Sequence, residues 1–291
     1  MPAAFLNAGA TSLAAANWSD AIGFADSAEL YIQSGTQTVT GGLTTSLANG
    51  IQNLDILSGW SGNIGGANGS LAVETRSSLL NQATQIPRVR YYASGGTFYY
   101  TPQSGGAASD VCDYYQIAGS GSGYLTGTGT VKRLESNGGR LYVGTAIGSV
   151  ANFRWVFANG TVTVDGVSGS TKIHALTIAG GQHLLKKGIQ GTSVTATGFT
   201  EGLNVCGGSV TIDAYAETFS DIRIYGGYVQ IVNAGTCAVV SGYSGTLDFS
   251  KLQRPLTLTL LEDAPGLTVI PSRLLTITTR NPIGPGANGL T

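Results

Sequence analysis

Short runs in which aliphatic and polar residues alternate recur along the second half of the chain. Each run has two aliphatic residues around a polar one, as in residues 162–164, 176–178, 203–205, 210–212, 222–224 and 229–231. A period of two places successive side chains on opposite faces of an extended chain, and β-branched residues favour that conformation. The runs therefore predict half-buried β-strands. Residues 54–56 show the same pattern in the first half, and residues 71–73 have two larger aliphatic residues around an alanine.

Glycine pairs or Asn-Gly pairs separate many of these runs. The second residues of the pairs, with one Ser-Gly at the end, lie 21, 21, 27, 19 and 18 residues apart and are Gly139, Gly160, Gly181, Gly208, Gly227 and Gly245. This length matches one coil of a three-faced β-solenoid, with an insertion in the longest interval. Glycine permits the positive φ that a sharp corner requires, and coils stacked about 4.8 Å apart can bury one another's inner faces. We predict an all-β chain folded as a right-handed parallel β-helix, or β-solenoid.

Three segments are expected. Residues 1–29 form an N-terminal capping or attachment segment, in which residues 3–16 hold one brief helix. Residues 30–250 form the solenoid, with irregular coils to about residue 130 and regular coils after it, and the glycine- and serine-rich residues 105–130 form a long exposed loop. Residues 251–291 supply C-terminal strands and an extended tail.

Composition and charge argue against several functional classes. Charged residues make up 11% of the chain and 44 residues are glycine, which suits short strands and tight turns. A net charge of −1 argues against nucleic-acid binding, which needs clustered Lys and Arg. The N-terminus lacks the basic region of a signal peptide, and no apolar stretch approaches about 18 residues. We therefore expect synthesis in the cytoplasm and no membrane partner.

Cofactor chemistry has no support in the sequence. No phosphate-binding loop is present, and Cys112, Cys206 and Cys237 lack the spacing of a metal site. We expect no cofactor, and we expect the cysteines to be small buried residues within the coils.

Two carboxylates are weak candidates for catalysis. Asp165 and Asp213 each follow a corner glycine by five residues, and Lys186 occupies the same position in the coil between them. Glycosidases use two carboxylates, which in inverting enzymes lie roughly 6.5–9.5 Å apart, whereas two coils separate these by roughly 9.6 Å. A lysine between them favours a salt-bridged series, so we expect no enzymatic activity.

Tyrosine pairs suggest an interaction surface. The pairs are Tyr91-Tyr92, Tyr99-Tyr100 and Tyr114-Tyr115. Adjacent residues of a strand point to opposite faces, so one tyrosine of each pair faces outward. Tyrosine combines apolar area with a polar tip and is enriched at interfaces. Contact with a neighbouring subunit is favoured, and sugar stacking is the alternative.

The first quarter of the chain carries a recognisable series of segments. A tryptophan-containing opening leads into a coil, then a leucine-rich line and a Ser-Gly-x-Ile-Gly turn, in residues 17–20, 30–32, 38–43, 51–57 and 60–65. Over about residues 15–75 this series resembles virion proteins of tailed bacteriophages. The resemblance implies a structural component of the particle that is often trimeric and has no enzymatic activity.

Within that resemblance we expect a capsid decoration or cement protein. It would lie on the capsid surface of the virion, bind the major capsid protein and form a homotrimer. The Tyr-rich edge and the C-terminal tail, with Ile283 and Leu290, would supply contacts. The alternatives are a tailspike or tail-fibre subunit that binds a host glycan, and a carbohydrate-active β-helix enzyme.

Overall fold

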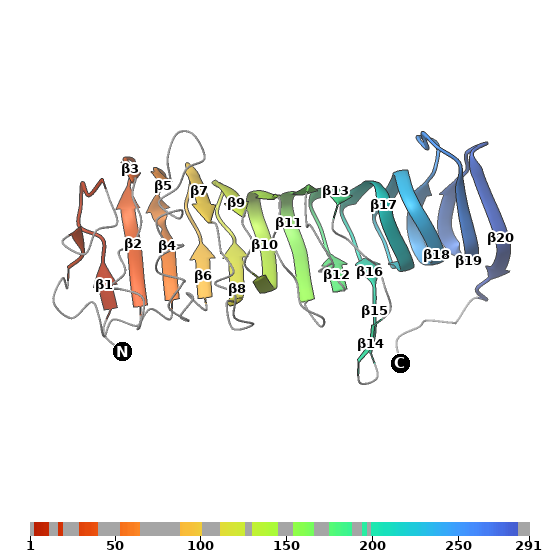
Figure 1. The fold of residues 1–291 in the computed structure, drawn as a ribbon, viewed down its shortest axis with the longest axis horizontal. Coiled ribbons are helices and arrows are strands. Elements are labelled where there is room, and N and C mark those ends of the chain that lie inside the picture. The colour runs from red at the N-terminus through yellow and green to blue at the C-terminus, as the bar shows by residue number, and fades with distance from the viewer. Residues whose placement is uncertain are drawn as a thin grey trace. The chain divides into compact units, whose positions relative to one another are not determined.

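The computed structural model describes residues 3–11, 17–19, 29–39, 53–64, 88–100, 111–125, 130–144, 154–165, 175–187, 194–196 and 199–284. These residues contain β-strands and no α-helix. The chain divides into two compact units, residues 1–149 and residues 150–291. Parallel strands stack coil upon coil in each unit (Figure 1), so each is a β-solenoid, as the alternation and the glycine spacing predicted.

The first unit has two stacked faces. One face contains β1 (Ala3–Phe5), β2 (Glu29–Gly35), β4 (Asn53–Trp60), β6 (Arg88–Tyr91), β8 (Val111–Ile117) and the first part of β10 (Thr130–Val143). The other contains β3 (Thr38–Val39), β5 (Asn63–Ile64), β7 (Thr97–Tyr100), β9 (Ser122–Leu125) and the last part of β10. All of these pairings are parallel, so equivalent positions of successive coils lie above one another.

The second unit repeats this arrangement. One face contains the first part of β11 (Arg154–Asp165), β12 (Ala175–Ile178), β16 (Leu203–Val205) and the last part of β17 (Ser209–Ile224). The adjoining face contains the end of β11, β13 (Gln182–Lys187) and the beginnings of β17 and β18 (Tyr228–Asp248). Strands β19 (Leu256–Ile270) and β20 (Leu275–Pro282) continue the parallel stack.

Inward positions build the hydrophobic core. In the second unit Leu176, Leu203 and Ile222 lie in register on successive coils and are at most 2% exposed. Complete burial of one such side chain contributes about 1.5–3 kcal/mol. In the predicted alternating runs that the structure describes, the aliphatic residues are buried and the middle residue is at least partly exposed. Asp55 is the exception, because it is 2% exposed and bound by Arg90. Residues 71–73 lie outside the described residues.

The corner glycines adopt the predicted conformation. All six have φ between 64° and 97° and are Gly139, Gly160, Gly181, Gly208, Gly227 and Gly245. They also lie against one another: a Cβ on Gly181 would approach Gly160 O to 2.4 Å, and one on Gly245 would approach Gly227 O to 2.5 Å. The corner therefore needs glycine both for its backbone angle and for the close approach of the next coil.

The 27-residue interval contains the predicted insertion. Strands β14 (Val194–Ala196) and β15 (Phe199–Glu201) pair in antiparallel fashion. Figure 1 shows this hairpin extending away from the parallel strands of its unit. Because the hairpin leaves and rejoins the coil between β13 and β16, the stacking of those strands is preserved.

Two segments differ from the local predictions. At the start of the segment expected to hold a brief helix, residues 3–5 form strand β1 instead, which pairs with β2 from Ala3 to Phe5; hydrogen bonding to a neighbouring coil overrides the helix propensity of alanine. Residues 12–16 of that segment lie outside the described residues. Residues 111–117 and 122–125, expected in an exposed loop, form β8 and β9. Gly121 and Gly123 between and within them are buried. A Cβ on Gly119 would lie 1.9 Å from Ala93 O, so here glycine marks close packing.

Candidate functional site

Asp165, the first of the two carboxylates, pairs with a lysine of the next coil. Its Oδ2 lies 3.5 Å from Lys186 Nζ. The ladder between β11 and β13 shifts after Val164, which places Asp165 opposite Lys187 while the Lys186 side chain still reaches it. Both partners are partly exposed, so the pair contributes at most about 1 kcal/mol. The expected salt bridge between Asp165 and Lys186 is present.

Asp213, the second carboxylate, is held by an amide. Its Oδ1 accepts a 2.7 Å hydrogen bond from Asn233 Nδ2, which also lies 3.2 Å from Gln253 Oε1. A shift in the ladder after Ile212 brings Asp213 opposite Asn233 of β18. The two carboxylates thus have different partners, and their catalytic role remains a hypothesis.

The inward tyrosines of the three pairs lie in the core of the first unit. Tyr91, Tyr100 and Tyr115 are at most 1% exposed and pack around Phe98, with ring centroids 5.4, 6.1 and 6.4 Å from its centroid. The alternation of β6, β7 and β8 turns one tyrosine of each pair inside, as predicted. As contact residues of the pairs, Tyr91, Tyr100 and Tyr115 are therefore ruled out, because their side chains are buried.

The outward tyrosines, Tyr92, Tyr99 and Tyr114, are partly exposed as predicted. Tyr99 lies in register with Tyr124, and Tyr124 with Tyr142, on successive coils. The Tyr99 and Tyr124 rings stack with centroids 4.5 Å apart and planes at 17°, and Tyr142 follows at 6.0 Å and 46°. We call Tyr99, Tyr124 and Tyr142 the tyrosine column.

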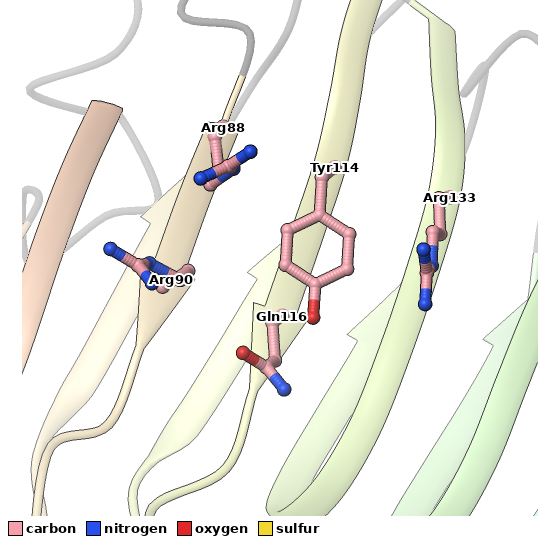
Figure 2. Close-up of a pocket in the computed structure, with 5 residues that line it drawn as sticks. All are labelled: Arg88, Arg90, Tyr114, Gln116 and Arg133. Atoms are coloured by element: carbon pink, nitrogen blue, oxygen red, sulfur yellow. The ribbon is translucent and has the colours of Figure 1, made fainter. Parts of the chain in front are cut away.

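A second group of outward residues surrounds a shallow hollow of about 350 Å³ on β6, β8 and β10. We call this hollow, with the described residues that line it, the arginine pocket; these residues are Arg88, Arg90, Tyr114, Gln116 and Arg133. Figure 2 shows Tyr114 between Arg88 on one side and Arg133 on the other. The register explains this arrangement, because Arg88, Tyr114 and Arg133 occupy equivalent positions of successive coils.

Two of the three arginines form ion pairs with carboxylates. Arg90 donates from Nε to Asp55 Oδ1 at 2.7 Å and from Nη2 to Oδ2. Asp55 is only 2% exposed, and its hydrogen bonds raise the pKa of Arg90. Arg133 donates to Glu135 Oε1 from Nε at 2.9 Å and from Nη2 at 2.6 Å. These pairs neutralise Arg90 and Arg133.

The neutral residues of the pocket are held in place. The Tyr114 hydroxyl donates to Glu135 Oε2 at 2.6 Å, and burial together with this bond raises the pKa of Tyr114. Gln116 Oε1 accepts a 2.7 Å hydrogen bond from Tyr92, and its Nε2 lies 3.4 Å from Glu135 Oε2. Arg133 covers Tyr114, with its guanidinium carbon 5.3 Å from the ring centroid. The pocket is therefore prearranged.

The sequence carried a signal for this pocket. Arg88 and Arg90 flank the buried Val89, and Asp55 lies between the buried Leu54 and Ile56. Charged residues at alternate strand positions mark an outward face, but the sequence does not show which strands stack. The pairing of β4 with β6 supplied that information.

The C-terminal residues and the cysteines lie in different surroundings. Ile283 is partly exposed, and its amide donates to Asp263 O at 2.9 Å. Leu290 lies outside the described residues. Cys237 is buried as expected, whereas Cys206 is exposed because it follows β16 at the corner; the Cys112 side chain also falls outside the described part.

No metal site is evident among the described residues. They contain no group of three or more His, Cys, Asp or Glu side chains placed to hold a metal ion. His183 is 4% exposed, and its Nε2 lies 2.5 Å from Gly180 O. Burial lowers the pKa of His183, so it acts as a neutral core residue beside Phe157, 5.2 Å away.

Comparison with known proteins found no relative. No protein-family model, no curated protein and no solved structure matches the chain. In the part of the chain that the structure describes, no helix is long and apolar enough to cross a membrane.

Proposed function

We propose that the chain is a non-enzymatic structural protein of a tailed-bacteriophage particle, a decoration or cement protein that binds the major capsid protein lattice. The resemblance over residues 15–75 to virion proteins supports the assignment to a phage particle. The tyrosine column supports a contact surface for a protein. Synthesis in the host cytoplasm, attachment at the capsid surface and assembly as a homotrimer belong to the same proposal.

The observation that carries the proposal is the stacking within the tyrosine column. Tyr99 and Tyr124 turn their ring faces toward each other at a centroid distance of 4.5 Å. A sugar stacks on an exposed ring face, whereas a protein partner can pack on ring edges and bond to hydroxyl groups. The column offers edges and hydroxyls on a rigid sheet, which favours a protein over a glycan as the partner.

The alternatives have less support. A carbohydrate-active enzyme needs an acid and a base or nucleophile, but Asp165 is paired with Lys186 and Asp213 with Asn233. A tailspike that binds a host glycan remains the second candidate, since Tyr142 at one end of the column is tilted from its neighbour by 46°.

The test combines location with a point variant. Cryo-EM of the particle that carries the chain is expected to show it over the capsid lattice, and light scattering of the purified chain is expected to give a trimer. Tyr124→Thr removes the middle ring of the column and keeps a strand-forming residue. We expect it to lower occupancy on tail-less heads severalfold.

The matched control is Tyr225→Thr. Tyr225 stacks on Tyr243 at 5.1 Å with planes at 2°, so this variant also breaks an outward tyrosine stack but leaves the column intact. Both variants are checked for unchanged thermal unfolding. Unaltered head occupancy of Tyr124→Thr, or density for the chain only at the tail vertex, would refute the decoration role.

A further inference from the structure

Arg88 is the cation of the arginine pocket for which the described residues supply no carboxylate. Among the residues that the structure describes, Arg90 is bound by Asp55 and Arg133 by Glu135, and no carboxylate pairs with Arg88. The register places Asn53 and Tyr114 on either side of Arg88, and neither is acidic. Arg88 is exposed, so its guanidinium is open to a ligand from solution.

The rest of the pocket is already committed. The Tyr114 hydroxyl and Gln116 amide nitrogen are directed to Glu135, and Gln116 Oε1 accepts from Tyr92. A sugar needs several free donors and acceptors for its hydroxyl groups, as well as an open aromatic face. Here Arg133 lies over Tyr114. The pocket therefore suits a ligand with one anionic group on a short apolar stem.

From this geometry we propose that the arginine pocket binds a carboxylate side chain from an acidic segment of a protein partner. Arg88 would form the same two-pronged contact that Arg90 makes with Asp55, and the Arg fork matches the planar carboxylate. The stem of the incoming Asp or Glu would lie beside Tyr114. A hollow of about 350 Å³ accommodates one such side chain and its neighbours. The inference builds on the proposed function only in taking the partner to be a protein.

The experiment measures binding of a fluorescein-labelled hexaglutamate peptide to the full chain by anisotropy. We expect saturable binding that weakens as salt rises, because exposed charges are screened. Arg88→Gln should weaken binding by about fivefold, the upper range for an exposed ion pair, and Arg88→Lys should retain only part of the affinity because the fork is lost. Arg88 is exposed, so both variants should unfold like wild type.

Arg273→Gln is the matched control. Arg273 is an exposed arginine of the second unit, and its loss removes one positive charge without touching the pocket. Equal peptide binding by wild type and Arg88→Gln, or an equal loss with Arg273→Gln, overturns the inference. A trigalacturonate competitor tests the other ligand class: if it binds as tightly as the peptide or more tightly, and depends on Arg88, the site is for an acidic sugar and the inference fails.

Failure of the two proposals can be told apart. Tyr124→Thr is expected to bind the peptide like wild type, since Tyr124 does not line the pocket. If the chain is absent from capsids but the peptide binds through Arg88, the decoration role fails and the pocket stands. If Tyr124→Thr loses capsid occupancy while no variant affects peptide binding, the decoration role stands and the pocket fails.

Discussion

Glycines at the corners serve two physical needs that can be separated by three alanine substitutions in the first unit. Gly96 has φ of 73°, and an added Cβ would lie 2.0 Å from Gly62 O. Gly9 has nearly the same φ, 78°, but a Cβ there meets nothing within 4 Å. Gly62 has no positive φ, yet its Cβ would lie 2.0 Å from Gln37 O. One variant therefore combines angle and clash, one has the angle alone and one the clash alone.

The expected costs follow from these distances. An L-residue in the left-handed region costs roughly 1–2 kcal/mol, which is the whole cost expected for Gly9→Ala. A contact of 2.0 Å with backbone can be relieved only by moving one coil away from the next, and such overpacking costs about 1–3 kcal/mol. Gly96→Ala should combine both and lose roughly 2–5 kcal/mol of the free energy of unfolding.

The assay is urea unfolding followed by tryptophan fluorescence in a Trp155→Phe background. Trp18 and Trp60, which are at most 2% exposed, then report on the first unit alone. The order of destabilisation should be Gly96→Ala, then Gly62→Ala, then Gly9→Ala. If Gly96→Ala costs no more than Gly9→Ala, the close approach of the coils is not what requires glycine, and the reasoning is wrong.

Two further predictions concern titratable groups of the second unit. Burial raises the pKa of Asp248, but hydrogen bonds from Tyr228, Ser250 and Gln230 outweigh it and lower the pKa from 3.8 to about 2. The folded state favours the carboxylate, which contributes roughly 2 kcal/mol of stability above about pH 4. This contribution is lost as the pH falls toward 2. Asp248→Asn should therefore flatten the acid-unfolding profile over that range, and an unchanged profile would contradict the reasoning. Burial raises the pKa of Cys237 to about 12. In a Cys112→Ser background, a thiol reagent at pH 8 should therefore modify Cys206 in the folded chain and Cys237 only after unfolding. Equal rates of modification of the two thiols, measured by mass spectrometry, would count against the buried position of Cys237.

The repeating part of the fold was predictable because one local signal recurs. The glycine at each corner marks the length of a coil. The aliphatic residues on each side of a polar one mark its inner face. Gly181 and Leu176 illustrate this, since their angle and burial match the pattern. The first unit was less predictable, because Gly119 marks close packing between coils although its sequence context resembles a loop.

The site was less predictable than the fold. Counting residues from a glycine cannot detect the ladder shifts after Val164 and Ile212, which decide the partners of Asp165 and Asp213. The arginine pocket needs Arg88 and Arg133 to be neighbours across three coils. Their separation along the chain is set by intervening segments whose lengths carry no periodic signal.

The β14–β15 hairpin shows where this architecture can change in length. It enters and leaves one coil of the second unit, while Gly181 and Gly208 on either side keep their corner geometry. Insertions at that point alter neither the inner face nor the spacing of the coils, whereas a single added carbon at the corner disturbs both. Segments of new specificity can therefore be exchanged at the hairpin as separate parts, with the stacked coils as a fixed support.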